Sequence, residues 1–124
     1  MESTVSISLL EQYNKKWLKF VFPQILDEGS AKKAIEIWNA HFAKELSGNE
    51  KANLIFDCRQ MKNYETASRL LWQKNMSDTR KQIGDIWIIS ENRLILAAAK
   101  TMGLLTGFKI KVTTLETSIY QEYR

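Results

Sequence analysis

The sequence predicts a single α/β domain over residues 1–124, in which a mixed sheet of about five strands packs with about four helices. Three observations predict this fold class. Two segments near the N-terminus alternate apolar and polar residues, which is the period of a half-buried strand. Two later segments are continuously apolar, as expected of strands inside a sheet. Between the strands, apolar residues recur every three or four positions, which is typical of helices that cover a sheet.

The first two elements form a predicted antiparallel hairpin. Residues 4–10 and 17–22 both alternate with a period of two. Asn14 lies between them and tolerates the left-handed backbone of a tight turn. Pro23, the only proline, follows the second strand, where its missing backbone donor removes no ladder hydrogen bond.

The first helix is predicted to begin at Ser30, as its N-cap, and to end at Gly48. His41, the only histidine, lies beside the apolar stripe of this helix, and we interpret it as a packing residue. The next strand, 52–58, is mostly apolar and belongs in the sheet interior.

The second helix is predicted over residues 65–76. Its spacing assigns one set of residues to the inner face: Ala67, Leu70, Leu71 and Lys74. The other side carries Trp72 together with Glu65, Ser68 and Asn75. We therefore expect Trp72 to point away from the core.

The last third of the chain contains a strand over 86–89, a helix over 93–105 and an edge strand over 109–113. The helix is capped by Ser90, Glu91 or Asn92 and stopped by Gly107. Its first half is apolar almost all round, which leaves two interpretations: it is wedged against the sheet, or its outer side meets a second subunit. The outward Lys109 and Lys111 discourage further pairing of the edge strand. A short last helix follows Thr114.

Composition excludes several classes of protein. With 44% hydrophobic and 26% charged residues the chain is an ordinary globular sequence, which excludes disorder. Its longest apolar run, Leu94 to Ala99, is far short of the roughly 20 residues that span a bilayer, so we expect no transmembrane segment. The N-terminus lacks the features of a signal peptide, and one cysteine forms no internal disulfide. These observations favour the cytoplasm.

The net charge of +4 does not indicate a nucleic-acid protein. The basic pairs are scattered between acidic residues: Lys15 with Lys16, Lys32 with Lys33, Arg80 with Lys81, and Lys109 with Lys111. Nucleic-acid domains concentrate such residues on one face. We interpret the excess as a solvated surface and expect no nucleic-acid partner.

No motif predicts a catalytic, cofactor or metal site. The loops after Asp57 and Ser90 contain no glycines to cradle a phosphate. One histidine and one cysteine are too few for a metal site. Cys58 follows an interior strand and is interpreted as a buried structural cysteine, and Asp57 and Glu65 as residues that satisfy backbone donors. We expect the protein to bind no cofactor and no metal, and we expect that it is not an enzyme.

The order of elements resembles the STAS domains, the fold of the anti-sigma-factor antagonists, over nearly the whole chain. The features concerned are a hairpin, a helix, a strand ending in Asp57, a loop into a helix, and two strand–helix units. The tail GDIWIISENRLILAAAKTMGLLTGFKIKVTTLETSIYQ is similar to the SpoIIAA-like branch of this group. The resemblance implies a bacterial regulatory protein that binds a protein partner such as an anti-sigma factor or a kinase-like protein.

The resemblance also implies where a phosphorylation switch would lie. Phosphorylated family members carry a D-S-S-G-like turn whose second serine is modified by a partner kinase. The matching residues here are Glu65, Thr66, Ala67 and Ser68, so alanine occupies the acceptor position. The usual switch is therefore predicted to be absent, with Thr66 and Ser68 as secondary candidates for phosphorylation.

Without that switch, the sequence predicts a non-enzymatic interaction module, with a homodimer as one form of it. The candidate interaction edge is the loop and first turns after the central strand: Asp57, Met61, Tyr64, Arg69 and Trp72. Exposed Met, aromatic and Arg residues are enriched at interfaces. The alternative is a small apolar-ligand, lipid-like binding domain. It predicts a sizeable enclosed cavity bounded by Trp38, Trp72, Trp87 or Phe108.

Overall fold

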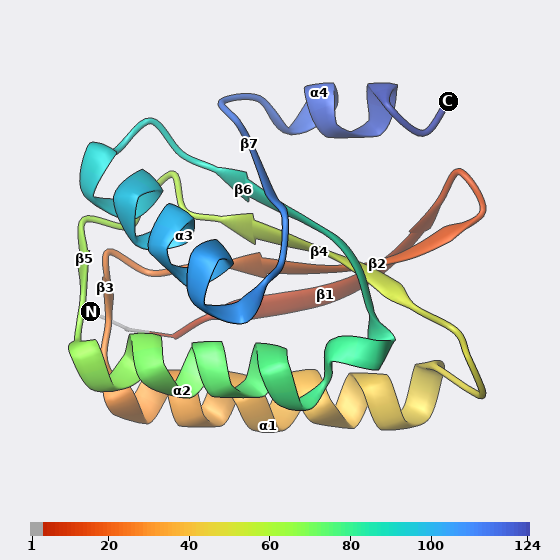
Figure 1. Cartoon of the computed structure of the whole chain (residues 1–124), viewed down its shortest axis with the longest axis horizontal. Helices are drawn as coiled ribbons and strands as arrows, with labels where there is room; N and C mark the ends of the chain where they lie inside the picture. The colour runs from red at the N-terminus through yellow and green to blue at the C-terminus, as the bar shows by residue number, and fades with distance from the viewer. Residues whose placement is uncertain (1–3) are drawn as a thin grey trace.

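Five strands build the central sheet of the computed structural model, which describes residues 4–124. They lie in the order β1-β2-β4-β6-β7 (Figure 1). Their bounds are β1 Ser6–Gln12, β2 Lys15–Val21, β4 Ala52–Asp57, β6 Ile83–Ile89 and β7 Ile110–Thr113. Only β1 runs antiparallel to its neighbour, and the other pairs are parallel. The mixed sheet with an N-terminal hairpin is therefore confirmed.

The helices divide between the two faces of the sheet. Helices α1 (Glu28–Glu45), α2 (Thr66–Asp78) and α3 (Arg93–Thr106) lie on one face, and α4 (Glu116–Gln121) lies on the other (Figure 1). Two short strands, β3 (Ile25–Leu26) and β5 (Asn63–Tyr64), pair in parallel apart from the main sheet. A 3₁₀ turn, η1 (Arg80–Gln82), joins α2 to β6. The short pair had no signal in the sequence pattern.

Alternation along the strands gives each face its own core. All six residues of β4 are buried, as expected of the central strand. Leu54, Phe56 and Cys58 belong to the large core under α1, α2 and α3. Ile55 lies between Leu54 and Phe56 in the strand, so its side chain points to the opposite face of the sheet. There it packs with Ile119 of α4 in the smaller core.

Helix ends follow local capping rules, with corrections to three predicted ends. The α1 helix is capped by Asp27, whose Oδ1 accepts from the Ser30 N–H at 2.8 Å, so the prediction of Ser30 as N-cap is wrong. This helix ends at Glu45, ahead of Gly48. Helix α3 is capped by Asn92 and stopped by left-handed Gly107, as predicted. The α4 cap is Leu115 rather than Thr114, and no side chain caps that end.

A buried asparagine joins β4 to β6 at an irregular point of their register. The Asn53 Oδ1 accepts from the Asp85 backbone N–H at 2.7 Å, where the register shifts between Ala52 and Leu54. Gly84 lies directly against this amide: a Cβ at position 84 would be 2.3 Å from the Asn53 Oδ1. The absence of a side chain at position 84 therefore permits the hydrogen bond.

We predict that Gly84→Ala destabilises the protein by about 1–3 kcal/mol, because Asn53 must move and release Asp85. Chemical denaturation measures the change in the free energy of unfolding. Gly29→Ala is the control: its Cβ would meet only Asp27 Oδ1, at 3.7 Å, within the first turn of α1. We expect the control to be neutral or slightly stabilising. Equal stability of the two variants would contradict the role assigned to Gly84.

Candidate functional site

A small apolar opening, here called the socket, lies between α2 and α3 at the carboxyl ends of β4 and β6. Its volume is about 70 Å³ and its exposed lining is wholly apolar. The sheet side and the connecting segments contribute Phe22, Leu26, Phe56, Cys58, Met61, Tyr64 and Ile88, and the helices contribute Arg69, Trp72, Ile95, Ala98, Ala99 and Met102. The carboxyl end of a parallel sheet is where ligands usually bind in open α/β folds.

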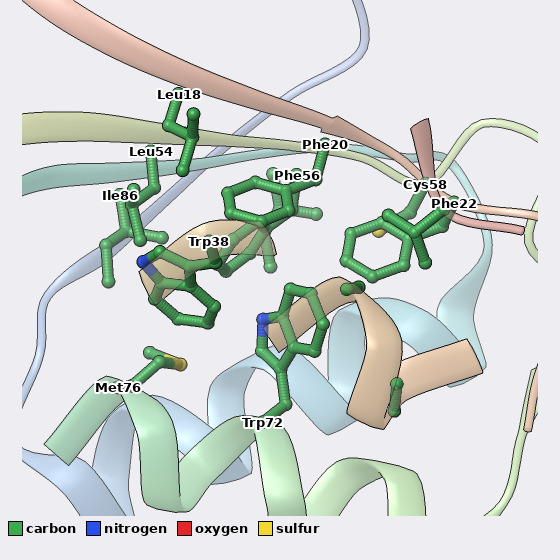
Figure 2. Close-up of a cluster of buried hydrophobic side chains, with 14 of the residues drawn as sticks. Leu18, Phe20, Phe22, Trp38, Leu54, Phe56, Cys58, Trp72, Met76 and Ile86 are labelled. Atoms are coloured by element: carbon green, nitrogen blue, oxygen red, sulfur yellow. The ribbon is translucent and has the colours of Figure 1, made fainter. Parts of the chain in front are cut away.

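An aromatic cluster forms the floor of the socket. Trp72 lies 5.1 Å from Phe22 and 5.8 Å from Phe56, measured between ring centroids. On its other side it lies 5.2 Å from Trp38 of α1. Figure 2 shows these rings gathered between the sheet and α2, with Cys58 and Phe22 at one end and Met76 at the other. Such mutual contact fixes the position of each ring.

The predicted orientation of the second helix is wrong, and this changes the candidate edge. The residues buried on α2 are Ser68, Trp72, Asn75 and Met76, while Leu70 is exposed. Polar residues are tolerated inside because they have partners: Ser68 Oγ donates to the Leu26 carbonyl at 3.0 Å, and the Asn75 amide pairs with Asn39 of α1. An apolar-face rule cannot anticipate such partners on distant elements.

Four of the five predicted edge residues meet at the socket, but two of them are not exposed. Met61 and Trp72 are buried, with only 3% of Trp72 accessible, so their predicted exposure is wrong. Tyr64 and Arg69 are half-buried at the socket. The Met61 carbonyl accepts from the Asn92 side chain at 3.4 Å, which ties the loop after β4 to the start of α3.

Asp57, the fifth predicted residue, lies on the other face of the sheet from the socket. Its carboxylate accepts from Arg59 Nε at 2.9 Å and from Arg59 Nη2 at 2.6 Å. Glu116 of α4 accepts from Lys19 Nζ at 2.7 Å, and its Oε1 is 3.7 Å from Arg59 Nη2. The four side chains alternate in charge and attach α4 to the sheet. Asp57 is thus part of a structural network.

The pKa of two neighbouring groups in this region moves in opposite directions. Burial by itself would raise the pKa of Asp57, but the hydrogen bonds and charge of Arg59 outweigh it, and the pKa is lowered. Burial, together with the nearby Asp57 charge, raises the pKa of the Cys58 thiol to about 12. Cys58 is therefore protonated at neutral pH, which disfavours a nucleophilic role.

The socket differs from the cavity that an apolar-ligand domain was expected to contain. Trp72 lines it, but Trp38 stands behind Trp72, and Trp87 belongs to the core on the opposite face. Phe108 lines a separate groove between α3 and β7. The expectation was a sizeable enclosed cavity bounded by Trp38, Trp72, Trp87 or Phe108, whereas the opening at Trp72 holds only about 70 Å³ and the groove at Phe108 is open to solvent.

Residues 4–124 contain neither a metal-binding cluster nor a membrane-spanning helix. Within that range no three His, Cys, Asp or Glu side chains gather closely enough to hold a metal ion. None of the helices there is both long enough and apolar enough to cross a bilayer.

Comparison with solved structures decides the fold. The chain superimposes on an uncharacterised protein of the DUF3478 family from Shewanella loihica PV-4, described as having a SpoIIAA-like fold, with a TM-score of 0.79. The alignment covers 98% of this chain and 94% of the other, at 12% identity. The chain has a SpoIIAA-like fold. No family model matches the sequence, and no curated protein gives a significant match.

The SpoIIAA-like fold places the predicted switch residues at the start of α2. Ala67 is exposed and has no hydroxyl. Ser68 is completely buried and bonded to Leu26, which contradicts its candidacy as a phosphoacceptor, because a kinase needs access to the hydroxyl. Thr66 is exposed at the first position of the helix and remains a candidate. Glu65 accepts from the Glu28 N–H at 2.6 Å and thereby links the starts of α1 and α2.

Sequence reasoning missed the contribution of α3 to the socket. Ile95, Ala98, Ala99 and Met102 form the wall opposite α2. The signal was present in the apolar first half of the helix, which was interpreted as a contact with the sheet or with a second subunit and not as a contact with α2. Small side chains at two of these positions are what leave the socket open.

We predict that Trp72→Ala lowers the free energy of unfolding by about 3–5 kcal/mol, as expected for loss of a large core side chain. Trp72→Phe should cost no more than about 1 kcal/mol, since the Trp72 Nε1 has no hydrogen-bond partner among residues 4–124 and its removal leaves nothing unsatisfied. Thermal and chemical denaturation measure both. A melting temperature unchanged by Trp72→Ala would contradict the placement of Trp72 in the core.

We predict that Asp57→Asn costs about 1–2 kcal/mol at neutral pH, a value reduced by solvent around half-exposed Arg59. The lowered pKa of Asp57 means that its contribution is present above the unfolded-state pKa and is lost as pH falls through the folded-state pKa. The difference between wild type and variant should therefore shrink from neutral to acidic pH, and vanish only once Asp57 is protonated in the folded state. Urea denaturation at the two pH values tests this, and a difference independent of pH would exclude the ion pair as its cause.

Proposed function

We propose that this protein is a non-enzymatic interaction module that receives an apolar side chain of a protein partner in the socket between α2 and α3. The observation that carries the proposal is the convergence of Met61, Tyr64, Arg69 and Trp72 on one solvent-connected apolar opening. Binding energy at protein interfaces concentrates where an anchor side chain fills such an opening. Arg69 and Tyr64 supply the residue types that interfaces favour around the anchor.

The size of the socket supports a side-chain anchor over a whole ligand. Small-molecule sites usually occupy about 300–1,000 Å³, whereas the socket holds about 70 Å³. That space suits the end of one aliphatic or aromatic side chain. The aromatic floor is held by contacts of 5–6 Å with neighbouring rings, so the socket exists before a partner arrives, which reduces the ordering cost of binding.

The phosphoserine switch of the anti-sigma-factor antagonists is not part of the proposal. Ala67 has no hydroxyl and Ser68 is buried, so partner choice is proposed to depend on the shape of the socket and on the charge of Arg69. The resemblance makes an anti-sigma factor or a kinase-like protein the first class of partner to consider, and the cytoplasm the compartment. Thr66 at the helix start stays a candidate for phosphorylation.

The second candidate function is binding of a small apolar ligand. The wholly apolar exposed lining favours it, and it requires α2 and α3 to separate further. Native mass spectrometry of the purified protein distinguishes the two functions, since retained apolar ligand supports the second and not the first.

We predict that Ala98→Leu, which places a larger side chain in the socket wall, abolishes partner binding without loss of stability. Ala67→Leu is the matched control: it makes the same change on exposed α2 surface outside the lining. Full-length wild type and both variants serve as baits in native lysate, and a protein retained by wild type and control but lost from Ala98→Leu is then purified. Titration calorimetry should show at least about a tenfold loss of affinity for Ala98→Leu.

The proposal is wrong if the purified partner binds Ala98→Leu as tightly as wild type. Circular dichroism and thermal melting of all three proteins ensure that a loss of binding reflects the socket and not unfolding.

A further inference from the structure

The outward side of α3 is apolar and uncovered. Leu104 and Leu105 are 78% and 62% exposed, and Leu94 and Val112 are about half exposed. Leu94 and Leu105 stand eleven residues apart, which returns to nearly the same direction around a helix. Figure 1 shows α3 on the outside of the molecule, with no other element over it. An apolar groove of about 510 Å³ continues from α3 to β7, lined by Leu96, Gly103, Phe108 and Ile110.

The excess of basic over acidic residues in the chain lies in this same part of the molecule. Residues 93–115 contain four basic residues, Arg93, Lys100, Lys109 and Lys111, and no acidic one. Since the whole chain has 18 basic and 14 acidic residues, the rest is balanced at 14 of each. The entire net charge of +4 thus belongs to α3, β7 and the residues that join and follow them.

Several of these cations are free of acidic partners. Lys111 is paired with Glu122 and Asp85 on the α4 side. No ion pair within residues 4–124 involves Arg93, Lys100 or Lys109. Lys100 lies at the groove, and Arg80 stacks on the Phe108 ring at 4.4 Å while donating to the Thr106 carbonyl. The apolar face is therefore flanked by unneutralised positive charge.

This combination identifies the chemistry of what covers the face. A second copy of the chain would bring the same positive charge against it, which opposes a symmetric dimer. An anionic surface is favoured by charge, because Lys and Arg side chains near such a surface are attracted to it. A fluid lipid surface can cover the exposed Leu94, Leu104 and Leu105 without a groove of matching shape, which a protein partner would need. Helices that lie in a membrane interface combine protruding apolar residues with flanking cations in this way.

We infer that the outward side of α3, with the adjoining edge of β7, docks on the surface of a membrane containing anionic phospholipid. Leu94, Leu104 and Leu105 enter the boundary between head groups and acyl chains, and Arg93, Lys100 and Arg80 lie at the level of the head groups. This inference does not rest on the proposed function, because none of these leucines and cations lines the socket.

Vesicle sedimentation of the full-length protein tests the inference. The probes are phosphatidylcholine vesicles with about one third phosphatidylserine, and vesicles of phosphatidylcholine alone. We expect binding to the anionic vesicles that weakens as salt is raised, and at least about tenfold weaker binding to the neutral ones. Absence of binding to anionic vesicles at low salt, or equal binding to both kinds, would overturn the inference.

Two variants and two matched controls locate the binding surface. The double variant Leu104→Ser with Leu105→Ser removes the two most exposed leucines of α3, and Lys100→Glu reverses one charge. Each should weaken binding by about tenfold or more. Leu70→Ser on α2 and Lys33→Glu on α1 make the same kinds of change at exposed residues elsewhere, and both variants should bind as wild type. Unchanged binding by the α3 variants would overturn the assignment.

Analytical ultracentrifugation separates this inference from the other two occupants of the face. A concentration-dependent dimer that the leucine variant abolishes, without vesicle binding, would assign the face to a second copy. Binding of polyglutamate but not of anionic vesicles would assign it to an acidic protein segment. Either result contradicts membrane docking and leaves the socket proposal untouched.

Discussion

Burial of β4 on both faces is the constraint on which the rest of the structure depends. A central parallel strand sends successive side chains to opposite sides, so Phe56 and Cys58 enter the core under α1, α2 and α3 while Ile55 and Asp57 face α4. Both sides must then be covered, because an exposed apolar face would cost the hydrophobic stabilisation of the strand. The three long helices cover one side. The other is covered by the single short α4, which depends on aromatic contacts and on the Asp57, Arg59, Glu116 and Lys19 network.

That alternation explains which parts of the site could be predicted from the sequence. The order of the long strands and helices, the hairpin turn at Asn14 and the caps of α3 depend on local residue types and were predicted correctly. The orientation of α2 was not, since Ser68 and Asn75 are buried through hydrogen bonds to Leu26 and Asn39, which are distant in sequence. Apolar spacing predicts that both residues face outward. Trp72 lies on the same side of the helix, so it was also predicted to face outward. The rule of apolar spacing therefore predicted the wrong orientation for Trp72, which is buried.

The start of α2 shows how the SpoIIAA-like fold can use the same position for a different purpose. In this chain the first turn carries structural hydrogen bonds: Glu65 accepts from the Glu28 N–H, and Ser68 donates to the Leu26 carbonyl. Both join α2 to the segment that contains β3 and the start of α1. A phosphate at Ser68 would break the contact with Leu26 and place charge in a closed interior. The turn is thus part of the fold, and regulation at this place would have to act through exposed Thr66.

Helix α3 connects the two proposed surfaces, since its inner side forms the socket wall and its outer side forms the basic apolar face. Ile95 and Ala99 face inward at a spacing of four residues, while Leu94 and Leu105 face outward. Ala98, Ala99 and Met102 of α3 line the socket, so a shift of α3 would change the width of the socket. Docking of the outer side on a membrane would restrict that shift. By linkage, a partner side chain in the socket and a membrane against the leucines would then alter one another's affinity, because both act on the position of one helix.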